Sequence, residues 1–94
     1  MATVYILFSE NLNAFYTGSC LNMEQRFIDH LTHKFIDSFT SKASDWVIFL
    51  SIDNLEYQQA RNIEKHIKSM KSKKYIISLK NYPDLVNKLT HRFL

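Results

Sequence analysis

Two strand-like segments joined by a short polar turn restrict the fold more than any other feature of this chain. Side chains in TVYILF, residues 3–8, divide between two faces, one of them wholly apolar, as in a half-buried strand. The cluster SENLN at residues 9–13 has the composition of a turn, and strand-like residues resume in AFYTG at residues 14–18. We therefore predict an antiparallel hairpin.

A loop with an even number of residues, such as 10–13, would set the register of this hairpin. Tyr5 would then lie opposite Gly18, and Leu7 would lie opposite Tyr16. The two tyrosines would share one face of the sheet as diagonal neighbours, within about 7–8 Å. The other face would carry Val4, Ile6, Phe8 and Phe15.

Gly18 is the only glycine in the sequence, and Pro83 is the only proline. At Gly18 the missing side chain would leave space beside Tyr5 for a ligand or another backbone segment to approach. So few flexible residues leave little material for linkers, and 94 residues support one hydrophobic core. We expect a single domain spanning residues 1–94.

A helix is predicted from about Met23 to Lys34, with Asn22 as its N-cap and Gln25 able to reach back to it. Its apolar stripe comprises Phe27, Ile28, Leu31 and Phe35. An adjacent polar stripe comprises Arg26, His30 and His33. A solvated surface is the ordinary explanation for such a polar stripe, and a functional site is the alternative.

The second half of the chain predicts another strand and further helices. WVIFLSI, residues 46–52, is almost continuously apolar and suggests a strand covered on both faces. Asp53 and Glu56 form a candidate capping pair before a long helix. That helix has an apolar stripe of Ala60, Ile63, Ile67 and Met70. The basic tail is predicted to be helical in two pieces, and Pro83 suits the start of the second. Its inward face would be Leu85, Val86, Leu89 and Phe93.

Glu64 lies at the edge of the apolar stripe of the long helix, three residues before Ile67. A carboxylate in that position could offer a metal ligand to a cleft. It could equally form a salt bridge with Lys68, four residues later, which is the commoner arrangement on helices. Spacing alone favours the salt bridge.

Positive charge is modest but concentrated after Glu64. The net charge is +3 and the pI is near 9.1, which favours a polyanionic partner. The clustered cations are Lys65, Lys68, Lys71, Lys73 and Lys74. They could follow a DNA backbone, or they could simply solvate a helix end. Phe39 or Trp46 could stack on bases, although burial in the core is the usual fate of a tryptophan.

Several chemistries lack their sequence signatures. The chain contains no P-loop, dinucleotide-binding glycine pattern or serine nucleophile motif. His30 and His33 have no third ligand nearby for zinc, and the single cysteine, Cys20, cannot form an internal disulfide. The longest early apolar run, residues 4–8, is too short for a signal peptide or a membrane span. We therefore expect a soluble, cytoplasmic protein without a membrane partner.

Five short elements, in order, carry a resemblance to a known family. They are VYI at residues 4–6, YTG at 16–18, Arg26, His30 and EKHIK at 64–68. Together they resemble the GIY-YIG nuclease domain, especially its small stand-alone members, from the first strand to the long helix. The resemblance implies an α+β fold with a small three-stranded antiparallel sheet flanked by helices. This agrees with the pattern of apolar residues.

The resemblance also implies a site and a reaction. Glu64 would hold a single Mg²⁺ or Mn²⁺, and Arg26 would bind the scissile phosphate of DNA. Tyr5 and Tyr16 would orient the attacking water, and one of them would act as general base once the metal and the arginine lower its pKa. His30 would assist by hydrogen bonding. The implied function is a metal-dependent DNA endonuclease of repair or recombination; the alternative is a catalytically silent module that binds nucleic acid or protein.

Three positions depart from the family pattern. Val4 replaces the first glycine of the name motif, and Thr17 replaces the middle isoleucine of the second. Both positions mainly serve backbone and packing, so these changes should leave fold and catalysis intact. Ser19 stands where repair incision nucleases of the superfamily carry a lysine, and that lysine's contact is therefore not expected here.

Overall fold

The computed structural model describes residues 1–32 and 39–94, which form an α+β fold. The elements in chain order are β1 (Ala2–Ser9), β2 (Ala14–Cys20), α1 (Met23–Leu31), the 3₁₀ helix η1 (Phe39–Lys42), β3 (Val47–Leu55), α2 (Tyr57–Met70), α3 (Lys73–Asn81) and α4 (Pro83–Arg92). The predicted hairpin, the third strand and the helices are all present.

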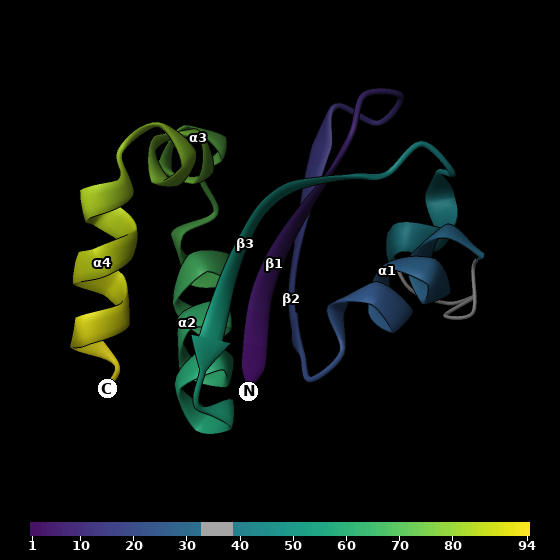
Figure 1. The fold of residues 1–94 in the computed structure, drawn as a ribbon. Coiled ribbons are helices and arrows are strands. Elements are labelled where there is room, and N and C mark those ends of the chain that lie inside the picture. Colours follow the sequence, from purple (N-terminus) through teal and green to yellow (C-terminus); the bar gives the residue numbers. More distant parts are fainter. Residues whose placement is uncertain (33–38) are drawn as a thin grey trace.

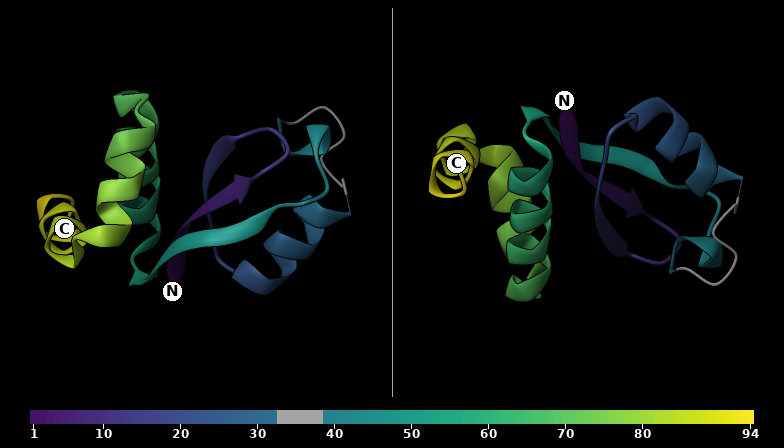
Figure 2. Two further views of the ribbon diagram at one scale, coloured as in Figure 1. Left: turned by 90° about the horizontal axis from the view of Figure 1, so that it is seen from above. Right: turned by 90° about the horizontal axis from the view of Figure 1, so that it is seen from below.

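The three strands form one antiparallel sheet in the order β2-β1-β3. Tyr5 pairs with Gly18 and Leu7 pairs with Tyr16, so the predicted hairpin register is confirmed. Helix α1 covers one face of this sheet, and α2, α3 and α4 lie on the other side (Figures 1 and 2). The outer edge of β2 therefore lies between α1 and α2.

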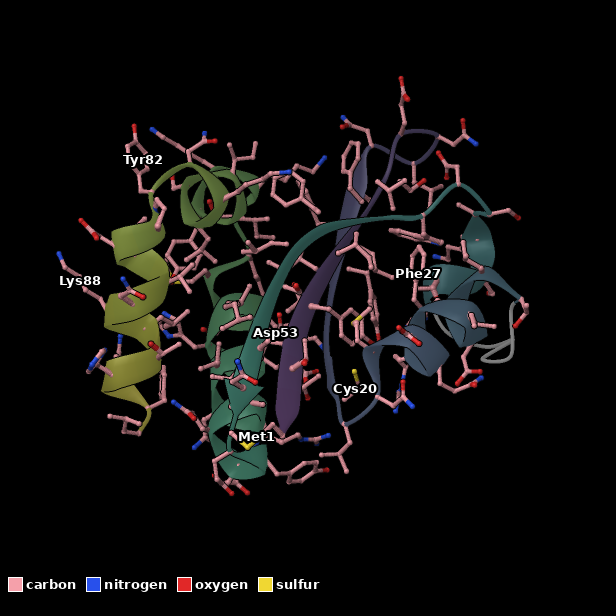
Figure 3. All side chains as sticks on the ribbon, viewed as in Figure 1. Met1, Cys20, Phe27, Asp53, Tyr82 and Lys88 are labelled. Atoms are coloured by element: carbon pink, nitrogen blue, oxygen red, sulfur yellow. The ribbon has the colours of Figure 1, made fainter. Side chains whose placement is uncertain are left out.

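The two faces of the sheet have separate hydrophobic clusters. The cluster facing α2, α3 and α4 is largely aliphatic and includes Val4, Ile6, Ile63, Ile67 and Leu79. The cluster facing α1 is formed by Tyr5, Leu7, Cys20 and Trp46, with Met23, Phe27 and Leu31 packed against it. Figure 3 shows Cys20 and Phe27 on this α1 side of the sheet. Burial of Trp46 in the core is confirmed.

The prediction that the third strand is covered on both faces is wrong. β3 is an edge strand, and Val47 and Ile48 at its start are 55% and 45% exposed. The central strand is β1, in which nearly every side chain is buried. A run of apolar residues does not encode strand order, and here the first strand, not the most apolar one, lies between its two neighbours.

Helix starts and stripes are partly as predicted. The Asn22 side chain accepts a hydrogen bond from the backbone N–H of Gln25 at 3.0 Å, although the Gln25 amide donates to Asp29 and not back to the cap. The described part of α1 ends at Leu31, and the predicted extension to Lys34 lies outside the described residues, as do His33 and Phe35. Ile28 is exposed, contrary to the predicted stripe.

The capping pair of α2 lies three residues later than predicted. Glu56 is the N-cap and forms a reciprocal capping box with Gln59, whereas Asp53 lies in β3 and accepts a hydrogen bond from Thr3. Met70 is exposed at the end of α2. Pro83 begins α4 as predicted, and Leu89 points into the aliphatic cluster.

Candidate active site

The hairpin places both tyrosines on the face of the sheet that α1 covers. Tyr5 projects from the central strand and Tyr16 from the outer strand, with their ring centroids 6.4 Å apart. Tyr5 is buried, whereas Tyr16 is partly exposed near the edge. The pair therefore extends from the core of the protein to its surface.

Gly18 makes this arrangement possible in a way that differs from the prediction. A Cβ atom at Gly18 would lie 2.4 Å from the Tyr5 hydroxyl oxygen and 2.5 Å from the ring carbon that bears it. The space left by the glycine is therefore filled by the Tyr5 ring itself. The expected approach of a ligand or another backbone segment at this point is wrong, because the cross-strand partner already occupies the space.

His30 connects Tyr5 to the segment that follows α1. Its Nε2 lies 2.9 Å from the Tyr5 hydroxyl, and its Nδ1 lies 2.7 Å from the hydroxyl of Thr40 in η1. The Tyr16 ring packs against the imidazole with a centroid separation of 5.1 Å. His30 is only 2% exposed, so a solvated stripe is the wrong description of this residue.

Burial controls the protonation of this network. Burial and the neighbouring Tyr16 hold the pKa of Tyr5 well above its ordinary value, although Arg26 acts in the opposite direction. Burial and Arg26 lower the pKa of His30, and Asp29 opposes them. Tyr5 therefore stays a phenol and His30 a neutral imidazole near pH 7. The Tyr5 hydroxyl can then donate to Nε2, in which case Nδ1–H donates to Thr40.

Glu64 approaches β2, the strand that carries Tyr16, from the α2 side of the sheet. Its Oε1 accepts a hydrogen bond of 2.5 Å from the Ser19 hydroxyl, and its Oε2 forms a 2.7 Å salt bridge with Lys68. The Lys68 ammonium also lies 5.6 Å from the centroid of the Tyr16 ring. The predicted salt bridge is present, yet the carboxylate is only 15% exposed and is directed at β2. The salt-bridge alternative for Glu64 is therefore confirmed, and the metal-ligand alternative stays a prediction.

Arg26 lies on the α1 side of the same strand end. It lines a hollow of about 320 Å³ together with Ser19, the residue that donates to Glu64. The charges of Arg26 and Glu64 both influence the titration of Tyr5, in opposite directions. The guanidinium and the carboxylate thus come from helices on opposite faces of the sheet and approach the edge of β2, beside the two tyrosines.

The predicted DNA-binding lysines divide into two groups. Lys68, Lys71 and Lys73 line a second hollow of about 360 Å³ beside Tyr16, at the other end of β2. Lys73 also donates a hydrogen bond to the backbone carbonyl of Asn13. Lys65 lies away from this hollow, in a shallow depression with His66 and Phe93, and Lys74 is exposed on α3.

Glu64 offers one carboxylate, so a cation bound there would take most of its ligands from water and substrate. Within the described residues, no group of three or more His, Cys, Asp or Glu side chains could hold a metal ion. One carboxylate is nevertheless enough for Mg²⁺ when phosphate oxygens and water complete the shell. The ammonium of Lys68 already satisfies the attraction of Oε2 for positive charge. A hard cation at Glu64 would therefore have to displace this ammonium or share Oε2 with it.

Comparison with models of known protein families gave a match. The sequence model of the GIY-YIG catalytic domain matches residues 1–76, which include all five candidate catalytic residues. The chain belongs to the GIY-YIG family. Catalytic domains of the GIY-YIG family are generally nucleases, typically act on DNA and use divalent metals. Comparison with curated proteins and with solved structures gave no match.

Two residues of this GIY-YIG site were missed in the sequence. Strand alternation places Ser19 on the opposite face from Gly18, where a covering helix could meet it, so this contact had a readable signal. Thr40 had none, because it belongs to an irregular polar connection. The side chain of Phe39, a predicted stacking residue, lies outside what the structure describes. Within the described ranges, no helix is long and apolar enough to cross a membrane.

Proposed function

We propose that this protein is a divalent-metal-dependent endonuclease that hydrolyses DNA phosphodiester bonds during repair or recombination, and that residues 1–94 act as a single domain. One observation carries the proposal: Ser19 joins the Glu64 carboxylate to the edge of β2 and also lines the hollow that contains Arg26. An acid, a guanidinium and two phenols can supply a metal ligand, a phosphate ligand and a general base, which are functions that metal-assisted phosphodiester hydrolysis uses.

Glu64 is the proposed ligand of one Mg²⁺ or Mn²⁺. Such an ion, when bound, supplies electrostatic stabilisation of the charge that develops on the phosphate and the leaving oxygen. Ser19 fixes one carboxylate oxygen, and Lys68 neutralises the other until a cation or substrate arrives. This arrangement keeps the carboxylate in one orientation. It also avoids the free-energy cost of a partly buried carboxylate without a partner.

Arg26 is the proposed phosphate ligand. Its guanidinium can donate two parallel hydrogen bonds to phosphate oxygens, which lysine cannot reproduce. The position of Arg26 in the hollow beside Ser19 gives substrate a route to it from solvent. The guanidinium would bind more tightly as negative charge grows on the phosphate in the transition state.

The two tyrosines have different proposed roles. Tyr16 lies nearer the surface, beside Lys68, and is assigned to orienting the attacking water and, as its phenolate, accepting the proton of that water. Tyr5 is a poor general base because burial raises its pKa, so its role is to hold His30 through the 2.9 Å hydrogen bond. His30 in turn packs against Tyr16 and restrains its ring.

Cleavage of supercoiled plasmid and branched DNA in Mg²⁺ tests the proposal. Glu64→Gln preserves shape and removes the charge, and Arg26→Ala removes the guanidinium. Each should lower the rate by at least about 100-fold. Lys88→Ala, on the far side of the molecule, serves as the control (Figure 3).

Two outcomes would contradict the proposal. Equal rates in the wild type, Glu64→Gln and Arg26→Ala would exclude this site as the source of cleavage. Tight DNA binding without cleavage, in both Mg²⁺ and Mn²⁺ and for every DNA shape, would favour the alternative of a catalytically silent binding module.

A further inference from the structure

One face of α2 follows the edge of β2 for most of the helix. Tyr57, Arg61, Glu64 and Lys68 are spaced by four, three and four residues, which places them in one row. The residues at the start of this row line the hollow that contains Arg26, and Lys68 lines the hollow beside Tyr16. Glu64 therefore lies between two hollows, each of which carries positive charge.

The hollow at the start of α2 has more positive than negative charge. Arg26 comes from α1 and Arg61 from α2, and Asp29 is the one acidic side chain among its lining residues. Asp29 is buried and accepts a hydrogen bond from the Gln25 amide at 2.9 Å. The Arg61 side chain forms no ion pair or hydrogen bond with any residue in the ranges 1–32 and 39–94. An anion is the ligand that this arrangement favours.

Tyr57 adds a second kind of contact to the same hollow. It lies one helical turn before Arg61, and its side chain is 51% exposed. An exposed aromatic ring beside a guanidinium can stack on a nucleic acid base while the guanidinium binds the adjoining phosphate. This one hollow therefore offers a contact for a phosphate and a contact for a base. A nucleotide would use both contacts, whereas a phosphate ion would use only the first.

We propose that Arg61 and Tyr57 form a subsite for the nucleotide next to the scissile phosphate, with Arg61 on its phosphate and Tyr57 on its base. The inference rests on the proposed function, because the position of the scissile phosphate is set by Glu64 and Arg26. Arg61 lies three residues before Glu64, about 4.5 Å along the axis of α2, so a strand bound at Glu64 also passes Arg61. The DNA strand then runs along the edge of β2, from Tyr57 towards Lys68.

Fluorescence anisotropy of labelled DNA in EDTA tests this subsite without cleavage. Arg61→Ala should weaken binding about tenfold and reduce the slope of log affinity against log salt by about 1. Tyr57→Ala should weaken binding several-fold, and Tyr57→Phe should bind like the wild type because stacking needs only the ring. Lys88→Ala removes the same net charge from the outer side of α4 and should leave both quantities unchanged.

Neutral methylphosphonates, placed singly around the cleaved bond, identify the phosphate that Arg61 holds. A methylphosphonate at one position beside that bond should weaken DNA binding by the wild type and leave DNA binding by Arg61→Ala unaffected. Two results would overturn the subsite even if the protein cuts DNA. In the first, Arg61→Ala has the DNA affinity and salt slope of the wild type. In the second, Arg61→Ala and Lys88→Ala lose the same DNA affinity. Selective loss in Arg61→Ala with no cleavage by the wild type would support DNA binding at Arg61 but refute the proposed nuclease, and with it the placement of this site beside a scissile phosphate.

Discussion

The two faces of the sheet are packed by different chemistry. The face towards α2, α3 and α4 is covered by aliphatic side chains such as Ile6 and Ile63. The face towards α1 contains a hydrogen-bonded series in which Tyr5, His30 and Thr40 are all buried. Trp46 adds to this side by donating to the backbone carbonyl of Thr40 at 2.9 Å.

This difference separates stability from chemistry. Aliphatic packing stabilises the fold through burial and is indifferent to the orientation of any one polar atom. A buried polar series holds its members in fixed orientations, because each unpaired donor or acceptor would be costly. We therefore expect substitutions in the aliphatic cluster to act mainly on folding, and substitutions in the Tyr5–His30–Thr40 series to act on activity as well.

The largest expected effect on stability is that of Ile63→Ala. Ile63 is fully buried in the aliphatic cluster, so its truncation should lower the free energy of unfolding by about 2–5 kcal/mol. Denaturant unfolding measures this loss, and Ile77→Ala on the exposed side of α3 is the matched control. The rate of DNA cleavage per folded molecule should be unchanged; a large fall in that rate would break the distinction between the faces.

Gly18→Ala should affect both properties. The added methyl group would overlap the Tyr5 hydroxyl, so the ring must move and the free energy of unfolding should fall by about 1–3 kcal/mol. Cleavage should fall at least about tenfold, since Tyr5 would lose its position against His30. In a Tyr5→Leu background the same substitution should cost less than about 0.5 kcal/mol, because the clashing ring is gone. An equal cost in both backgrounds would show that another contact is responsible.

The same contrast explains how much of the structure could be predicted. The hairpin register and the aliphatic stripe of α2 follow from residue periodicity, and both are confirmed at Tyr5, Gly18 and Ile63. The burial of His30 could not be read in this way, because a polar stripe on a helix is normally solvated. Its partners Tyr5 and Thr40 are 25 and 10 residues away, in other elements.

The candidate site shows a related limit. The motif identified Glu64 and Arg26 as candidates, but only the fold shows that helices on opposite faces bring them to one strand edge. Spacing presented a salt bridge with Lys68 and a metal ligand as alternatives for Glu64; the salt bridge is confirmed, and the metal ligand stays a prediction. The exposed edge position of β3 was likewise unreadable, since strand order depends on long-range pairing.

Acid conditions should weaken the polar face selectively. The pKa of His30 is lowered by burial and by Arg26, although Asp29 acts in the opposite direction, and the rings of Tyr5 and Tyr16 pack on the imidazole. The unfolded chain therefore binds the proton first, so this stability is complete above the ordinary histidine pKa of about 6.5 and is lost as pH falls below it.

The comparison of pH 8 with pH 5.5 in denaturant unfolding measures this effect. The wild type should lose more stability than His30→Gln, by at most about 1.4 kcal/mol per pH unit for one proton. His91→Gln, on the exposed side of α4, is the control and should follow the wild type. Identical pH dependence in the wild type and His30→Gln would show that the buried imidazole is not the titrating group.

The smallest effect on stability should come from Lys68→Met, at the edge where the two faces meet. Lys68 pairs with Glu64 one helical turn away and is about half exposed, so the pair should contribute no more than about 0.5 kcal/mol. Its ammonium nevertheless occupies the oxygen that a cation would use. Removing it should therefore strengthen Mn²⁺ binding several-fold, measured calorimetrically without DNA, while the unfolding midpoint stays nearly constant.

Lys65→Met, directed away from Glu64 on the same helix, changes the net charge equally and should leave Mn²⁺ affinity unaltered. If both variants strengthen Mn²⁺ binding alike, the change in overall charge is the cause. Lys68 at the edge of β2 would then have no greater effect on metal binding than Lys65 elsewhere on α2.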